Sequence, residues 1–87
     1  MIEVELKLLS ESGTYLKSSE VPALPNRGDK FTDGYLSCLV DRNEFVLCKI
    51  SSGTLVQIHL SGAMLYQLPA KYEDEHDYLD SIGWVRQ

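Results

Sequence analysis

The stretch IEVELKL at residues 2–8 decides the fold of this chain, because apolar and charged side chains alternate in it without exception. Its apolar residues are Ile2, Val4, Leu6 and Leu8, and the residues between them are Glu3, Glu5 and Lys7. A period of two is typical of a β-strand that has one face in the core and the other in solvent. The chain therefore begins with a predicted half-buried strand.

The next segment predicts a hairpin. Residues 10–13 read Ser-Glu-Ser-Gly, a composition that favours a turn, and residues 14–19 form a second, less regular strand. Residues 2–19 are therefore expected to pair as two antiparallel strands.

A proline-rich crossing follows at residues 22–34. Pro22 and Pro25 have no backbone N–H to give to a sheet, so this segment is expected to lie at a sheet edge or in a loop. The triplet Arg27-Gly28-Asp29 would act as an adhesion signal only on a secreted protein. We instead expect a turn in which the Asp29 carboxylate accepts backbone N–H groups, after which Phe31 enters the core.

The second half of the body predicts several short strands separated by turns. The expected strands are residues 35–40, 45–50 and 54–60, with residues 63–68 as a further short strand or a helical turn. The expected turns are Asp41-Arg42-Asn43-Glu44, Ser51-Ser52-Gly53 and Ser61-Gly62. Short strands with turns every 8 to 12 residues are typical of a small barrel or sandwich.

The C-terminal segment differs from the rest, since residues 71–87 carry a net charge of −3 out of the total of −5. Its early acids favour a helix N-terminus and Gly83 favours a C-cap, which predicts a short helix over residues 74–82. Tyr78, Leu79 and Ile82 would form its apolar face.

These patterns predict one mainly β domain over residues 1–87. We expect a small antiparallel β-barrel or sandwich of about five to six short strands with one short C-terminal helix. The sheet body would occupy residues 1–70, and the acidic helix and tail would occupy residues 71–87.

The acidic segment is also the candidate partner-binding site. Its carboxylates could imitate phosphates toward a protein with a basic surface, and exposed aromatic residues among polar ones are typical of binding hot spots. The candidate residues are Tyr72, Glu73, Asp74, Glu75, Asp77, Tyr78, Asp80 and Trp84. In the alternative interpretation the apolar residues pack the helix onto the sheet and the acids keep it soluble, and for Trp84 this packing role is favoured.

The net charge of −5 and a pI near 4.8 argue against direct binding to nucleic acid or to an anionic membrane. No apolar run approaches the roughly 20 residues that span a bilayer. The N-terminus carries acids where a signal peptide has a basic start. These features predict a cytoplasmic protein.

The residues that could support catalysis or bind metal are few. Cys38 and Cys48 would point to opposite faces if the loop between them is Arg42-Asn43, whereas a loop that also includes Glu44 would place them opposite each other and allow a bridge. Two free thiols are favoured. His59 is the base that could serve either thiol.

Four possible metal ligands lie close in the acidic segment: Asp74, His76, Asp77 and Asp80. Of these, His76 and Asp80 would share one helix face, which is too few for a metal site. We therefore expect no catalytic, cofactor or metal site.

The motifs LPNRGDKF (residues 24–31), NEFVLCKI (residues 43–50) and VQIHL (residues 56–60) together resemble a pattern of small acidic phage and prophage β-barrel proteins. In that family a Leu-Pro-x-x-Gly-Asp turn opens a strand, and later strands complete the barrel. The resemblance covers residues 23–60. Some small acidic phage proteins inhibit host defence, including anti-CRISPR proteins, so the resemblance implies an inhibitor of a host nucleic-acid-handling complex.

Three functional hypotheses follow. The favoured one is an interaction module that binds and modulates another protein through its acidic segment. The second is a structural β-domain, part of a virion or complex, which forms a homodimer or larger homo-oligomer. The third is a small thiol enzyme that uses Cys38 or Cys48 with His59.

Overall fold

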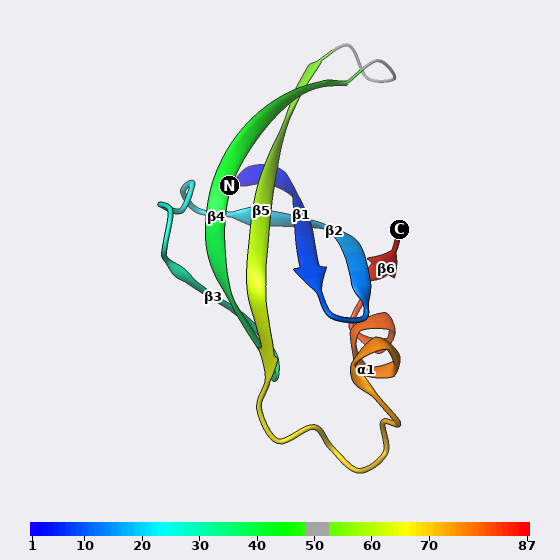
Figure 1. The fold of residues 1–87 in the computed structure, drawn as a ribbon. Coiled ribbons are helices and arrows are strands. Elements are labelled where there is room, and N and C mark those ends of the chain that lie inside the picture. The colour runs from blue at the N-terminus through cyan, green and yellow to red at the C-terminus, as the bar shows by residue number, and fades with distance from the viewer. Residues whose placement is uncertain (49–52) are drawn as a thin grey trace.

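The structure is a computed structural model that describes residues 1–48 and 53–87. These residues form one mixed six-stranded sheet and one short helix (Figure 1), which confirms the mainly β fold predicted from the sequence. The elements are β1 (Ile2–Ser10), β2 (Gly13–Val21), β3 (Lys30–Asp33), β4 (Leu36–Cys48), β5 (Gly53–Leu65), α1 (Glu75–Ser81) and β6 (Val85–Arg86). The strand order is β3-β4-β5-β1-β2-β6.

The opening hairpin forms as predicted. β1 and β2 pair antiparallel from Ile2 opposite Val21 to Ser10 opposite Gly13. Val4, Leu6 and Leu8 are buried, whereas Glu3 and Leu9 are exposed, so the period of two in the sequence becomes the inner and outer faces of the sheet.

One pair of strands is parallel, which the sequence did not predict. β1 pairs with β5 from Val4 opposite Val56 to Leu8 opposite Leu60, and every other pair in the sheet is antiparallel. Parallel neighbours require a long connection, and here it includes β2, β3 and β4. An alternating pattern encodes which face is buried, but not the direction of the neighbouring strand.

The predicted turn at Asp41-Arg42-Asn43-Glu44 is wrong. These residues lie inside β4, which runs unbroken from Leu36 to Cys48 and pairs with β5. A β-bulge between Val40 and Arg42 absorbs Asp41 as an extra residue, so the chain kinks there without reversing. The predicted turn at residues 51–53 includes residues outside the described part of the chain.

The long β4 also overturns the expected positions of the cysteines. Cys38 and Cys48 lie on one strand, ten residues apart, which corresponds to about 33 Å of extended chain. The hairpin that would place them opposite each other does not exist, so the bridge considered from the sequence is wrong.

The predicted turn at Ser61-Gly62 is wrong for a similar reason. β5 continues through it to Leu65, and the ladder with β4 is irregular between Ser37 and Leu39. Gly62 adopts a φ of 63°, a left-handed conformation that lets one extra residue of β5 form a bulge. Residues 63–68 were expected as a further short strand or a helical turn, and the structure instead has residues 63–65 as the end of β5.

The Arg27-Gly28-Asp29 segment is a tight turn that precedes β3. The Asp29 N–H donates to the Asn26 carbonyl at 3.0 Å, and Gly28 has a φ of 89°, as a type II turn requires at its third residue. The Asp29 carboxylate accepts the Asn26 N–H at 2.8 Å, as predicted. Phe31 then packs against the core.

The sheet curls until its two ends meet through side chains. Lys17 of β2 binds Asp33 of β3 at 2.6 Å, although these strands lie near opposite ends of the strand order. The Trp84 indole N–H donates to the same Asp33 oxygen at 3.0 Å. Among the described residues no backbone ladder joins β3 to β2 or β6, so side chains hold this incomplete barrel together.

Candidate interaction surface

The helix α1 carries four of the eight predicted binding residues, Glu75, Asp77, Tyr78 and Asp80, and it begins at a well-formed cap. Asp74 is the N-cap, and its carboxylate accepts the Asp77 N–H at 2.8 Å. The Asp77 carboxylate accepts the Glu73 N–H at 3.2 Å in return. This reciprocal arrangement resembles a capping box, and it confirms the prediction that the early acids stabilise a helix N-terminus.

The C-terminal end of α1 is equally well defined. The Trp84 N–H donates to the Leu79 carbonyl at 3.0 Å and the Gly83 N–H donates to the Asp80 carbonyl at 3.3 Å. With Gly83 at a φ of 98°, these bonds form a Schellman motif. The predicted helix is therefore confirmed as Glu75–Ser81, one residue shorter at each end than the predicted range 74–82, and Gly83 ends it in the expected left-handed conformation.

Two of the three aromatic candidates, Trp84 and Tyr78, are buried. Trp84 is fully buried beneath the Lys17 and Asp33 pair, with the Lys17 ammonium 5.7 Å from its ring centroid. Tyr78 is 3% exposed, and its hydroxyl accepts the Tyr35 N–H at 2.9 Å. Both side chains pack the helix onto the sheet, so neither can contact a partner in this fold.

Two further contacts hold the first turn of α1. The buried Tyr15 hydroxyl lies 3.1 Å from Nδ1 of His76 and 2.8 Å from the Ser12 hydroxyl. Ser12 donates in turn to the Glu75 carboxylate at 3.4 Å. His76 and Glu75 thus face the β1–β2 turn and are half-buried.

The remaining candidate acids face solvent, and they form what we name the acidic surface: Glu73, Asp74, Asp77 and Asp80. Tyr72 is half-buried beside it, edge-on to Tyr78 at 5.0 Å between ring centroids. The first turn of α1 has acids and its last turn has no base. Such a surface can accept hydrogen bonds and ion pairs from lysine or arginine.

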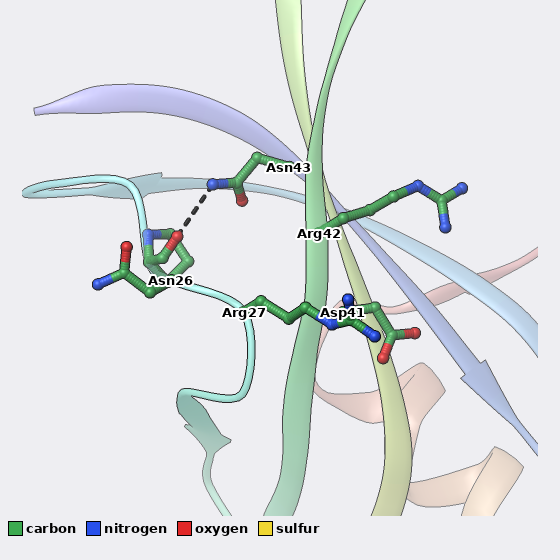
Figure 2. A pocket seen from close by; sticks show the side chains of 6 residues that line it. Asn26, Arg27, Asp41, Arg42 and Asn43 are labelled. Atoms are coloured by element: carbon green, nitrogen blue, oxygen red, sulfur yellow. Dashed lines mark hydrogen bonds between the residues drawn. The ribbon is translucent and has the colours of Figure 1, made fainter.

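A hollow lies between the turn before β3 and the bulge of β4. It has a volume of about 500 Å³ and is lined by Pro25, Asn26, Arg27, Asp41, Arg42 and Asn43. Figure 2 shows Asn43 reaching toward the loop, where its amide donates to the Pro25 carbonyl at 2.9 Å, while Arg42 points away from the loop. The hollow brings no nucleophile next to a base.

The thiol and imidazole considered for catalysis lie apart. Cys38 is buried on the inner face of β4, and burial together with the charge of Asp33 raises the pKa of its thiol to about 11. His59 alternates with the buried Ile58 and Leu60 and therefore lies on the outer face of β5. The Cys48 side chain is outside the described part of the structure.

In the described ranges 1–48 and 53–87, no three histidine, cysteine, aspartate or glutamate residues come together as a metal site would require. Over the same ranges, no helix is long and apolar enough to cross a membrane.

Comparisons with protein-family models, with curated proteins and with solved structures find no match for this chain. The phage-type resemblance of residues 23–60 therefore stays a prediction.

Sequence reasoning missed two residues that shape these surfaces. Asp33 joins the ends of the sheet, and a single acid at the end of a short strand gives no signal of that role. Phe45 is 69% exposed on β4, although it was expected to be an ordinary strand residue. The absence of glycine from residues 41–44 was the signal that could have revealed a continuous strand there.

Proposed function

We propose that this protein is a small acidic interaction module that binds another protein with a basic surface through its acidic surface, and so modulates or inhibits that protein. The observation that supports this proposal most is that α1 is fixed in place while its carboxylates remain exposed. The proposal assigns the chain no catalytic activity, cofactor or metal.

The rigidity of α1 matters because binding is weakened by the cost of ordering flexible groups. The helix is capped at both ends, and Tyr78, Trp84 and His76 attach it to three different parts of the sheet. Its exposed acids are therefore held in one arrangement before any partner arrives. Carboxylates held in this way favour fast, selective association with a basic surface.

The phage-type resemblance suggests the class of partner. A protein that holds nucleic acid has a basic groove, and a fixed row of carboxylates can occupy such a groove in place of phosphates. We therefore propose an inhibitor of a host nucleic-acid-handling complex, similar in action to anti-CRISPR proteins. The cytoplasm is the compartment that this proposal implies.

The test is affinity capture of the partner from host lysate, followed by measurement of its Kd with purified variants. The informative variant is Glu73→Gln with Asp80→Asn, because neither carboxylate takes part in the helix cap. The matched control is Glu3→Gln with Glu20→Gln, which removes the same charge from an exposed pair on β1 and β2.

We expect the α1 variant to bind about 10-fold more weakly, equivalent to about 1.4 kcal/mol, and the control to bind as the unaltered protein does. Equal weakening by both variants would show that only net charge matters. Unchanged binding by the α1 variant would reject the acidic surface as the site.

A structural role in an assembly is the second candidate function. The edge of β4 from Glu44 onward, which no described strand covers, favours it. A thiol enzyme that uses Cys38 with His59 has no comparable observation in its favour, since these two residues lie on different faces of the sheet.

A further inference from the structure

The hairpin of β4 and β5 extends beyond its neighbouring strands. On one side, β3 pairs with β4 only at residues 36–39, and the turn before β3 adds hydrogen bonds to Val40. On the other side, β1 pairs with β5 only at residues 56–60. Figure 1 shows the resulting arm, which projects from the sheet along the 42 Å long axis of the molecule.

The described part of this arm is a two-stranded ribbon. Phe45 pairs with Val56, and Val46 pairs with Leu55. Beyond Val56, toward the end of the arm, no described strand lies beside the outer edge of β4 or of β5. A two-stranded ribbon is marginally stable alone in water, and a third strand stabilises it. The free edge of β4 from Glu44 onward presents backbone N–H and C=O groups to which such a strand could bond.

The side chains at this edge are apolar where an unpaired edge is normally protected by charge. Phe45 is 69% exposed, and Val46 is only half-buried. Natural edge strands use lysine, proline or a bulge to prevent pairing. Here the bulge and the charges lie at residues 41–44, before the apolar stretch begins.

We propose that the protein forms a homodimer in which the β4 edges of two copies pair antiparallel about a two-fold axis through the Phe45–Val46 segment. The two sheets would join into one, and the two Phe45 side chains would lie beside each other. This inference does not depend on what the acidic surface binds.

Charge favours a second copy as the occupant. Among the described residues of β4, Arg42 and Glu44 are the charged residues nearest to the apolar stretch, and their side chains lie 3.8 Å apart, so the formal charges of this pair cancel. The acidic surface lies at the opposite end of the molecule (Figure 1). With a two-fold axis through Phe45 or Val46, Glu44 of one copy does not lie opposite Glu44 of the other copy. This arrangement avoids the repulsion of like charges on paired strands.

The test is the molar mass in solution over a concentration series, measured by light scattering after size-exclusion chromatography. The variant is Phe45→Lys, and the matched control is Leu9→Lys, which alters an equally exposed apolar residue, 61% exposed, on the outer face of β1. We expect a dimer for the unaltered protein and the control, and at least about 10-fold weaker dimerisation for Phe45→Lys.

Hydrogen exchange of the unaltered protein provides a second measurement that requires no variant. We expect the Glu44–Val46 amides to exchange more slowly at high concentration than at low concentration. A monomer at every concentration would overturn the proposal. A dimer that Leu9→Lys weakens and Phe45→Lys does not, or a dimer without added protection at Glu44–Val46, would overturn it too.

Discussion

Gly34 shows how one residue fixes the position of the helix. It has a φ of 62°, and a Cβ built on it would collide with the Tyr78 hydroxyl. That hydroxyl accepts the N–H of Tyr35, the next residue in the chain. A side chain at position 34 would therefore disturb both the turn between β3 and β4 and the packing of α1.

We expect Gly34→Ala to lower the free energy of unfolding by about 2 to 3 kcal/mol, through left-handed backbone strain and a displaced Tyr78. The control is Gly62→Ala, since Gly62 has nearly the same φ, 63°, and a Cβ added there would have nothing within 4 Å. Gly62→Ala should lower the free energy of unfolding only through left-handed backbone strain, by about 1 to 2 kcal/mol. Equal losses in urea unfolding would show that the Tyr78 contact has no effect.

At the scale of elements, the outer face of the sheet carries a row of basic side chains across three strands. Lys7 of β1 pairs with His59 of β5, which pairs with Arg42 of β4. Burial of the imidazole and the charge of Arg42 lower the pKa of His59 most, and Lys7 lowers it further, against the opposing effects of Glu44 and Asp41. The folded protein therefore prefers neutral His59.

This preference makes stability depend on pH. Because the folded pKa lies below the unfolded value, the stabilisation is complete above about pH 6.5 and is lost as the pH falls from there through the folded pKa. We expect His59→Gln to show a shallower loss of unfolding free energy than the unaltered protein between about pH 7.5 and about pH 5.5. Parallel curves in urea titrations would contradict this assignment.

The same elements show what the sequence could predict. The alternation in β1 and the caps of α1 are local patterns, and both were confirmed. The continuity of β4 was missed because Asp41-Arg42-Asn43-Glu44 has the composition of a turn, whereas pairing with β5 and a bulge keep it extended. Propensity is a weak guide where a neighbouring strand supplies the hydrogen bonds.

The candidate site was predicted in part. Its helix and its acids follow from residues 73–83 alone. The burial of Tyr78 and Trp84 depends on Asp33, Tyr35 and Lys17, which lie far away in the sequence and meet them only because the sheet curls. A single sequence records no such long-range contact.

At the scale of the molecule, side chains complete what the backbone leaves open. The two ends of the sheet are connected by Lys17, Asp33 and Trp84. One carboxylate oxygen of Asp33 accepts hydrogen bonds from both the Lys17 ammonium and the Trp84 indole N–H. Loss of this acceptor would leave a buried indole N–H without a partner, which is costly.

We expect Asp33→Ala to lower the free energy of unfolding by about 2 to 3 kcal/mol. Asp33→Asn should cost less, about 1 kcal/mol, because an amide oxygen can still accept the indole N–H while the partly exposed ion pair is lost. As a control, Glu44→Gln removes the more exposed ion pair with Arg42 and should change stability by less than about 0.5 kcal/mol. If Asp33→Ala lowers the stability in thermal unfolding no more than Glu44→Gln does, side chains do not hold the ends of the sheet together.

The measurement that tests the central claim most directly is carbodiimide labelling of carboxyl groups in the free protein and in its complex with the captured partner. Labelled sites are located by mass spectrometry. Our account predicts that labelling of Glu73, Asp77 and Asp80 falls in the complex while labelling of Glu3 and Glu20 stays unchanged. Unchanged labelling of the acidic surface, with protection elsewhere, would contradict it.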